Sequence, residues 1–273
     1  MLITKGGTMK SKDLKQNLYL PSEEYFKLPA LSYSGLKDLE VSPEDYYYYH
    51  ILKNEKGSSA AQELGSAVHL YCLEPEKFDE NVGVWNRVKR GKEWDKWPCN
   101  DRLVFKPEDF DKIQAMGDRV LNHPVAGELI KKGEIERSLV WTHEDFEVSC
   151  KARPDVMVPD LAIVADLKTT RVATWREFQS EIARFKYHYQ AAWYLEGANA
   201  VQDKIEYEEF VWICIENTPP YKTALYSADW WMIEKARDEI RPLVELYAKC
   251  KADDHWPGCE ENIQEISLPT WAT

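Results

Sequence analysis

The hydrophobic and polar positions divide the chain into a first half with helical periodicity and a second half in which strand patterns appear. Within residues 60–73, Leu64, Ala67, Val68 and Tyr71 recur at helical spacing and form one apolar stripe. Further helices are expected over residues 107–122 and 124–132, while residues 81–106, rich in Trp, Lys and Arg, are expected to form a loop. The first half is therefore expected to be helical.

Two short helices are expected before residue 60. One runs through GLKDLE, with Ser32 or Ser34 as its N-cap, and stops before the Ser42-Pro43 pair. The other opens with Pro43 at a first-turn position, where two following acidic residues suit a helix N-terminus.

Strand patterns begin at residue 138. Residues 138–158 look like a hairpin around His143-Glu144-Asp145, and residues 161–169 (LAIVADLKT) form a short apolar strand. One long amphipathic helix is expected over 174–198, closed by Gly197. Two strands (208–216 and 221–227) and a final helix (228–250) follow. This order predicts an α/β (α+β) fold, a mixed central β-sheet flanked by helices.

The length of 273 residues favours one substantial domain. Residues 1–27 carry few periodic apolar positions and are expected to form a flexible N-terminal arm, which leaves residues 28–273 as a single domain. No run approaches the roughly 20 apolar residues of a membrane-spanning helix. The polar N-terminus lacks the apolar core of a secretory signal. We therefore expect a cytoplasmic protein without a membrane partner.

Cysteine spacing and net charge narrow the chemistry. The six cysteines contain no CxxC pair, so they are interpreted as reduced thiols and not as zinc or iron–sulfur ligands. The formal net charge of −12 argues against a general nucleic-acid coat, because phosphate binding requires a positive surface. It does not exclude an enzyme that gathers carboxylates around a metal and keeps its basic residues local.

Three polar residues fall where two apolar segments end: Asp155 in RPDVM, and Asp166 and Lys168 in VADLK. Asp166 and Lys168 are two apart on a strand, so they share a face. Antiparallel pairing through the short link Pro159-Asp160-Leu161 would bring Asp155 beside Asp166. Two carboxylates and an ammonium would then converge.

Two adjacent carboxylates need a compensating charge. Oxygen ligands of this kind suit Mg²⁺, for which Mn²⁺ can substitute. Such an ion would activate water and stabilise the charge that develops on a scissile phosphate, with Lys168 assisting. The alternative is a surface salt bridge between strand-end charges, which usually contributes less than about 1 kcal/mol.

The segment ARPDVMVPDLAIVADLKTT resembles the signature of the PD-(D/E)xK nucleases. It is most similar to the exonuclease VIII (RecE-type) branch, and more distantly to the RecB nuclease domain and lambda exonuclease. GSAVHLYCLEP resembles that branch's histidine-bearing helix, YHYQAAWYLEGA its helix with glutamine and tyrosine, and LSYSGLKDLEVSPEDYYYY its opening segment. The resemblance covers about residues 28–228 and implies a restriction-endonuclease-like core.

The resemblance also implies an activity. Members hydrolyse linear double-stranded DNA from an end in the 5′-to-3′ direction, depend on a metal, and leave 3′ single-stranded overhangs for recombination. It implies ring-shaped homo-oligomers (trimers or tetramers), a single-strand annealing recombinase as partner, and a phage or prophage gene expressed in a bacterial cytoplasm.

Further residue roles follow from the resemblance. His69 and the Leu167 backbone carbonyl would join Asp155 and Asp166 as metal ligands. Gln190 and Tyr194, on one helix face, would contact the scissile phosphate and the nearby strand. Without the resemblance, His69 would be interpreted as a core residue. Gln190 and Tyr194 would be interpreted as polar helix residues that touch the sheet.

Glu136 matches an acidic position of related nucleases and would help to hold a metal-bound water. By sequence alone Glu134 is an equally good candidate.

DNA contacts are expected in three places, one of which is a basic set near the site formed by Arg171, Arg176, Arg184 and Lys186. Residues 85–97 interleave tryptophans with cations, which suits phosphate binding and base stacking; the candidates are Arg87, Lys89, Arg90, Lys92 and Trp94. The alternative is a solvated loop anchored by its tryptophans. Thr169 and Thr170 follow Lys168, where their hydroxyls would bind phosphate or cap the next helix.

Other functions stay open at this point. A PD-(D/E)xK endonuclease would carry the same three residues, because they do not encode dependence on a DNA end. A non-catalytic DNA-binding recombination accessory protein would be marked by a broken triad, whereas here the triad is intact. A small-molecule enzyme lacks support, since no Gly-rich phosphate loop, G-x-S-x-G or H-E-x-x-H occurs.

Overall fold

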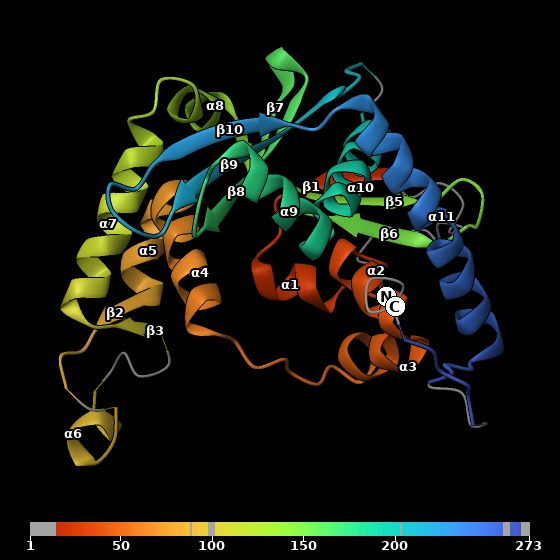
Figure 1. Cartoon of the computed structure of the whole chain (residues 1–273), viewed down its shortest axis with the longest axis horizontal. Coiled ribbons are helices and arrows are strands. Elements are labelled where there is room, and N and C mark those ends of the chain that lie inside the picture. Colours follow the sequence, from red (N-terminus) through yellow and green to blue (C-terminus); the bar gives the residue numbers. More distant parts are fainter. Residues whose placement is uncertain (1–14, 88, 98–101, 203, 259–262, 269–273) are drawn as a thin grey trace, which may run out of the picture.

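A mixed five-stranded sheet forms the centre of the computed structural model, which describes residues 15–87, 89–97, 102–202, 204–258 and 263–268. Its strands, in spatial order, are β10 (Thr223–Ser227), β9 (Glu209–Glu216), β8 (Ile163–Thr170), β7 (Val156–Val158) and β4 (Glu134–Ile135). β8 and β9 run parallel, and the other neighbours are antiparallel. The predicted mixed sheet with flanking helices is confirmed (Figure 1).

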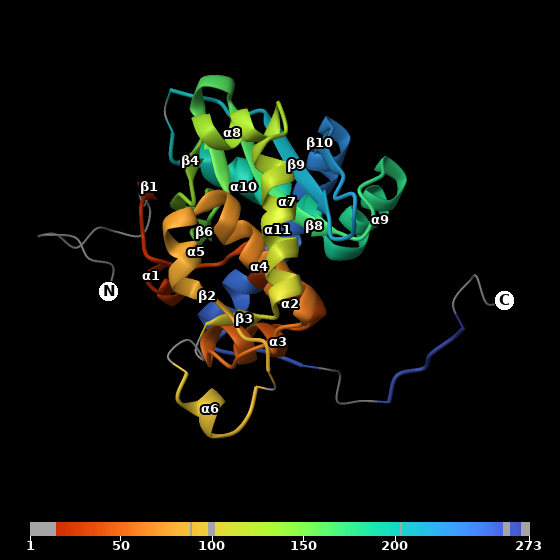
Figure 2. The ribbon, with the colours of Figure 1, turned by 90° about the vertical axis from the view of Figure 1, so that its left-hand side faces the viewer.

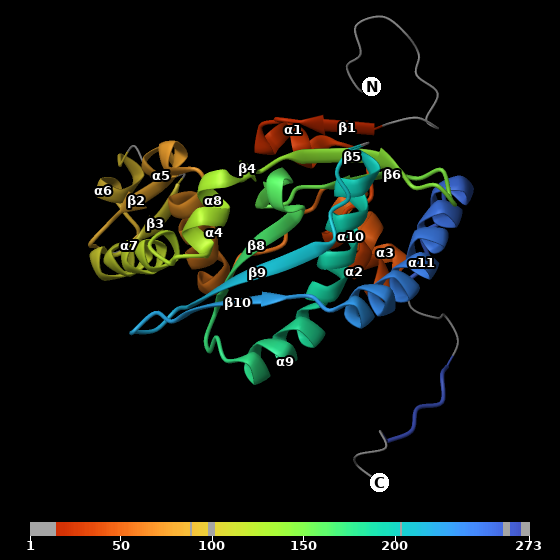
Figure 3. The same cartoon turned by 90° about the horizontal axis from the view of Figure 1, so that it is seen from above.

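Helices cover both faces of this sheet. The α-helices of the described residues are α1 (Ser22–Lys27), α2 (Tyr33–Val41), α3 (Pro43–Tyr46), α4 (Ala60–Leu73), α5 (Pro75–Asn81), α6 (Lys92–Asp95), α7 (Pro107–Leu121), α8 (Ala126–Lys132), α9 (Trp175–Phe185), α10 (Tyr187–Ala200) and α11 (Trp230–Asp253). α4 and α7 lie toward one end of the molecule, and α10 and α11 toward the other (Figures 1 and 3).

Alternation along β8 divides the interior into two cores. Ala165 and Leu167 pack with side chains of α4, α7 and α8, whereas Val164 packs with those of α2, α10 and α11. Asp166 and Lys168 share the parity of Val164, so they lie on the α10 face. Both faces of β8 are therefore covered.

The second arm of the hairpin expected over residues 138–158 is divided between strands of two different sheets. β5 (Ser138–Thr142) pairs with β6 (Ser149–Ala152), as predicted, and β1 (Lys15–Leu18) adds to β5. The chain then leaves this sheet, and β7 begins at Val156 in the central sheet. Asp155 stands at the start of β7, directly after this break.

The expected long helix over 174–198 is divided into α9 and α10. Lys186 adopts a left-handed backbone conformation with φ 59°, which ends α9 and turns the chain before α10 starts. The predicted end at Gly197 is also wrong, because α10 continues to Ala200. A Cβ at Gly197 would lie 2.7 Å from Trp141 Cζ3, so close packing explains this glycine.

The N-terminal half follows the predicted helices closely. Ser32 is the N-cap of α2 and accepts a hydrogen bond from Gly35, and α4 spans residues 60–73 with a capping box from Ser59 and Gln62. The expected loop over 81–106 contains β2 (Val82–Val84) and β3 (Leu103–Phe105), paired in parallel, with α6 projecting from the body (Figure 2).

Three smaller predictions can be compared with the structure. The part of the expected arm from Lys15 to Lys27 contains β1 and α1, while residues 1–14 lie outside the described residues. Cys72, Cys150, Cys214 and Cys250 are buried free thiols, as interpreted, and Cys99 and Cys259 lie outside the described residues. Among the described helices, none combines the length and apolarity needed to cross a bilayer.

Candidate active site

The edge of β8 is open over its second half, because β7 is only three residues long and pairs with Ile163–Ala165. The peptide groups of Leu167 at this edge are bound by side chains instead of a strand. Asp155 Oδ2 accepts the Leu167 N–H at 2.6 Å, and His69 Nε2 lies 2.6 Å from the Leu167 carbonyl oxygen. A short neighbouring strand thus creates the place where Asp155 and His69 meet.

The two nitrogens of His69 have unequal environments. When Nε2 carries the proton and donates to Leu167, Nδ1 presents a lone pair to Asp155 Oδ2 at 3.4 Å. Two acceptors that face each other require a cation or a second proton between them. This arrangement suits a metal ion bound by His69 and Asp155.

Glu136 completes a group of three ligating side chains. One ligand atom each of His69, Glu136 and Asp155 lies within 4.8 Å of the others. Glu136 has a left-handed backbone (φ 51°), its N–H donates to the Asp155 carbonyl at 3.0 Å, and Arg153 Nε lies 2.6 Å from Glu136 Oε2. Glu134 instead forms an ion pair with Arg137 at 3.3 Å. The structure thus places Glu136, and not Glu134, beside the candidate metal ligands.

Asp166 is held by two other side chains. Gln190 Nε2, on α10, donates to Asp166 Oδ1 at 2.5 Å, and Lys168 Nζ lies 2.5 Å from Asp166 Oδ2. The Lys168 ammonium also lies 4.8 Å from the centre of the Tyr187 ring. Asp166 is 2% exposed, so this carboxylate depends on its partners for compensation.

Burial and mutual repulsion set the proton affinities of these groups. Burial raises the pKa of Asp155 well above its usual range, and the neighbouring Asp166 raises it further. Burial and Asp155 raise the pKa of Glu136 to about 7. Burial lowers the pKa of Lys168, but Asp166, Tyr187 and Asp155 outweigh it, so the net pKa is raised and the amine stays protonated. The protonated Lys168 amine therefore does not compensate the negative charge of Asp155, Asp166 and Glu136 together.

The donor set fits a divalent cation. The carboxylate oxygens of Asp155 and Glu136 suit a hard divalent cation, and the His69 imidazole can add a nitrogen donor. Of the four predicted ligands, the structure brings together His69, Asp155 and the Leu167 carbonyl. Asp166 lies next to them but faces Gln190 and Lys168.

The remaining predicted site residues lie in different surroundings. Tyr194 is half-buried, and its ring lies edge-on to that of Tyr33 with the two centroids 6.4 Å apart. Thr169 lines the cleft in front of the site. Thr170 is buried and its hydroxyl donates to Glu181 at 2.8 Å. The capping alternative for these threonines is wrong, since Thr174 is the N-cap of α9.

The basic loop lies apart from the cleft. The rings of Trp85, Trp94 and Trp97 pack on one another with centroids 5.0–5.5 Å apart, an arrangement that anchors the loop. Arg87 pairs with Glu93, and Lys89 donates to the Val104 carbonyl at 2.8 Å. Arg90 and Lys92 are exposed. Whether the loop contacts DNA stays a prediction.

Sequence reasoning missed two residues of the site. Arg153 carries the charge opposite Glu136, and it lies only two positions before Asp155, within the same RPD segment. Tyr187 faces Lys168 and begins the helix that carries Gln190. Tyr187 was missed because the sequence predicted one continuous helix, whereas the direction of the Tyr187 side chain depends on the turn at Lys186.

The cleft in front of these residues has a volume of about 1060 Å³. α4 contributes one wall, with Gln62, Ser66 and His69. The other wall comes from the end of β8 and the segment that joins α9 to α10. A cleft of this size admits an extended polymer strand to the side chains at β8.

One protein family and several solved structures are similar to this chain. The family described as "PDDEXK-like domain of unknown function (DUF3799)" matches residues 32–269. The crystal structure of a candidate exonuclease from Eubacterium rectale is similar at a TM-score of 0.62 and 16% identity, over 93% of this chain and 98% of that chain. An alkaline exonuclease (LHK-Exo) from Laribacter hongkongensis matches at a TM-score of 0.41 and 12% identity, over 85% and 97%. No curated protein matches.

Proposed function

The chain belongs to the family of PDDEXK-like domains (DUF3799), and on that premise we propose that it is a Mg²⁺-dependent exodeoxyribonuclease. The observation that supports this most is the open edge of β8. There Asp155, Asp166 and Lys168 lie beside His69 and Glu136, at the base of a cleft. Of the described side chains, His69, Glu136 and Asp155 form a group that could hold a metal ion.

In the proposed chemistry, the metal ion and the protein side chains have different roles. A bound Mg²⁺, held by His69, Asp155 and Glu136, would supply Lewis-acid activation of water and of the scissile phosphate. Lys168 would stabilise the negative charge that develops on the phosphate oxygens, which suits its persistent protonation. Gln190 would fix the direction of the Asp166 carboxylate toward the site.

The finer features of the proposal rest on the resemblance to RecE-type exonucleases. We propose that the substrate is the end of linear double-stranded DNA, degraded 5′-to-3′ to leave 3′ overhangs for single-strand annealing. A ring-shaped homo-oligomer, an annealing recombinase as partner and a phage or prophage origin belong to the same proposal. The exposed cations Arg90 and Lys92 would add contacts outside the cleft.

An endonuclease is the second candidate, because the open edge of β8 contains nothing that requires a strand end. A non-catalytic accessory protein is disfavoured, since the triad is intact and its charges converge. The substrate's topology separates exonuclease from endonuclease.

The test uses end-labelled linear duplex and covalently closed circular DNA, each incubated with the purified full chain in Mg²⁺ or in EDTA. We expect Mg²⁺-dependent release of nucleotides from the linear duplex while the circle survives. Label at the 5′ or 3′ end reports the polarity. Cutting of the circle would replace the exonuclease by an endonuclease, and an inert protein in Mg²⁺ and Mn²⁺ would refute the nuclease.

A further inference from the structure

Three cations line the cleft without a carboxylate partner. Lys37, Arg171 and Arg184 all contribute to its walls. Within the described part of the chain, no carboxylate lies within ion-pair distance of any of the three. Other basic side chains do have carboxylate partners, among them Lys56, Arg153, Lys186, Lys235 and Arg241. The positive charges of these three side chains are thus available to bind an anionic ligand in the cleft.

Lys37 lies close to the catalytic lysine. Its ammonium is 4.6 Å from the centre of the Tyr33 ring, while Lys168 lies over the neighbouring Tyr187. Burial lowers the pKa of Lys37, and the positive charge of Lys168 lowers it further. Two ammonium groups in one partly buried place repel each other, and an anion between them would relieve that repulsion.

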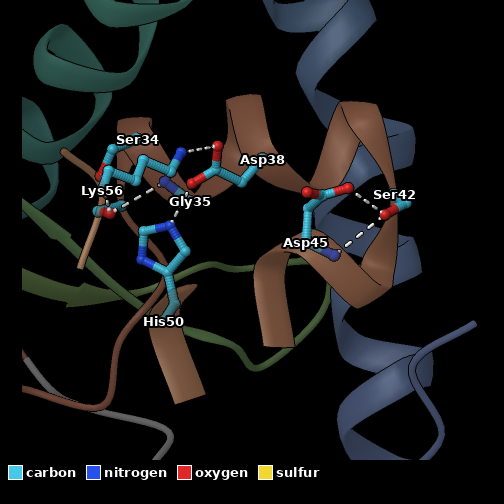
Figure 4. Close-up of polar contacts among 8 residues, drawn as sticks. Ser34, Gly35, Asp38, Ser42, Asp45, His50 and Lys56 are labelled. Carbon is cyan, nitrogen blue, oxygen red and sulfur yellow. Dashed lines mark hydrogen bonds and ion pairs between the residues drawn. The ribbon is translucent and has the colours of Figure 1, made fainter. Parts of the chain in front are cut away.

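The carboxylate next to Lys37 in sequence is already engaged. Asp38 accepts from His50 at 2.7 Å and also pairs with Lys56, on the side of α2 drawn in Figure 4. Ser42 and Asp45 bond each other at the end of the same helix. These contacts hold α2 in place and leave Lys37 without a counter-ion.

The acidic residues of the cleft are likewise engaged. Glu136 faces Arg153, Glu74 pairs with Lys77, and Glu181 accepts from Thr170 at 2.8 Å. Among the described residues, no carboxylate is therefore left to pair with Arg171 or Arg184; the Arg184 guanidinium lies 5.1 Å from the centre of the Phe185 ring. Free guanidinium groups beside a metal site fit bidentate binding of phosphate oxygens.

We propose that Lys37, Arg171 and Arg184 bind phosphates of the DNA strand being cut, on either side of the phosphate at the metal ligands. The proposal rests on the proposed nuclease function and assigns the cleft wall opposite α4 to the sugar–phosphate backbone. Of the basic groups near the site, Lys37 would contact the phosphate adjacent to the scissile one, since it shares the surroundings of Lys168. A backbone track of this kind holds the strand without reading its sequence.

The test measures binding apart from cleavage. Fluorescence anisotropy of a labelled duplex, with Ca²⁺ in place of Mg²⁺, gives Kd over a series of salt concentrations. We expect Lys37→Gln, Arg171→Gln and Arg184→Gln each to weaken binding about three- to tenfold. Each should also reduce the slope of log Kd against log salt by about 0.7–0.9. Lys37→Arg should restore most of the affinity.

The matched control is Lys249→Gln. Lys249 is exposed on α11, at the opposite end of the molecule from α4 (Figure 1). It should leave Kd and slope unchanged. The unfolding temperatures of all variants are compared first. If Lys37→Gln folds poorly, the affinity of Lys37→Arg still tests the role of Lys37.

The outcomes separate this proposal from the nuclease assignment. If all three variants keep the wild-type Kd and slope, the phosphate track is wrong even when the wild type cleaves DNA. If the wild type binds DNA and the variants weaken it, yet Mg²⁺ and Mn²⁺ support no cleavage, the track stands and the nuclease fails. A wild type that binds no DNA overturns both.

Discussion

Gln190 on α10 donates its side-chain amide to Oδ1 of Asp166 on β8 at 2.5 Å, so a helix orients the buried carboxylate of the central strand. The other oxygen of Asp166 faces Lys168. Gln190 is itself 4% exposed, and none of the described residues donates a hydrogen bond to its Oε1. The carboxylate is thus positioned before any substrate arrives.

Removing this contact should impair turnover more than folding. We expect Gln190→Leu to lower the rate at saturating DNA by about 10- to 100-fold, because a side chain that orients a metal-site carboxylate usually contributes that much. Single-turnover cleavage over a Mg²⁺ series would measure it. DNA affinity in Ca²⁺ serves as the control and should stay within about twofold. An unchanged cleavage rate would show that Gln190 does not position Asp166.

Asp166→Asn tests the carboxylate itself. The substitution keeps the shape and removes the charge, so we expect Mg²⁺-dependent cleavage to fall by more than about 100-fold. Asn is preferable to Ala, since Ala would leave the Lys168 ammonium buried beside a cavity. Asp160→Asn, at an exposed carboxylate in the turn before β8, is the matched control. Cleavage near the wild-type rate in Asp166→Asn would remove Asp166 from the mechanism.

The pairing of Asp155 and Asp166 could be predicted because short-range rules determine it. A three-residue link between apolar runs dictates antiparallel strands, and the two-residue period places Asp166 and Lys168 on one face. The break between β6 and β7 could not be predicted. The short segment Arg153-Pro154-Asp155 separates the two strands, and it is the second sheet that reveals that the chain changes partner after Ala152.

The sequence also could not predict features that depend on the backbone conformation, such as which of two glutamates joins the site. Glu134 and Glu136 are equivalent by pattern. The left-handed conformation at Glu136 directs the chain so that Glu136, and not Glu134, meets Arg153. Similarly, Lys186 adopts a positive φ although it is not a glycine, so the sequence contains no signal for this turn. Tertiary packing overrides local preference at both positions.

The basic loop should contribute less to DNA binding than its composition suggests. Arg87 and Lys89 already have partners, which leaves Arg90, Lys92 and Lys96 as the cations of the loop that can contact phosphate. We expect the double change Arg90→Gln/Lys92→Gln to reduce the salt slope by up to about 1.8 if both touch DNA. The anisotropy assay measures this, with Lys89→Gln as the comparison. A slope equal to that of the wild type would confine DNA binding to other surfaces.

Gly197 should be intolerant of a side chain although it lies in a helix. Alanine normally favours a helix by about 1 kcal/mol over glycine. Here the new Cβ would lie 2.7 Å from Trp141, so we expect Gly197→Ala to lower the free energy of unfolding by about 1–3 kcal/mol. Urea unfolding measures it. Gly57→Ala, where a Cβ meets nothing within 4 Å, is the control and should be near neutral.

The pH dependence of stability should reverse when metal binds. The pKa of Glu136 is raised from 4.5 to about 7 by burial and by Asp155. Between these values the folded protein keeps a proton that the unfolded chain has lost, so raising the pH lowers the stability contribution of Glu136 in EDTA. A metal ion requires the deprotonated carboxylate. Mn²⁺ should therefore raise Tm by about 5 °C above pH 7.5 and by much less near pH 5.5. Calorimetry in EDTA and in Mn²⁺ measures both curves, and Glu134→Gln, outside the metal group, should reproduce them. A Mn²⁺ effect that is equal at both pH values, or that survives in Glu136→Gln, would exclude Glu136 as a ligand.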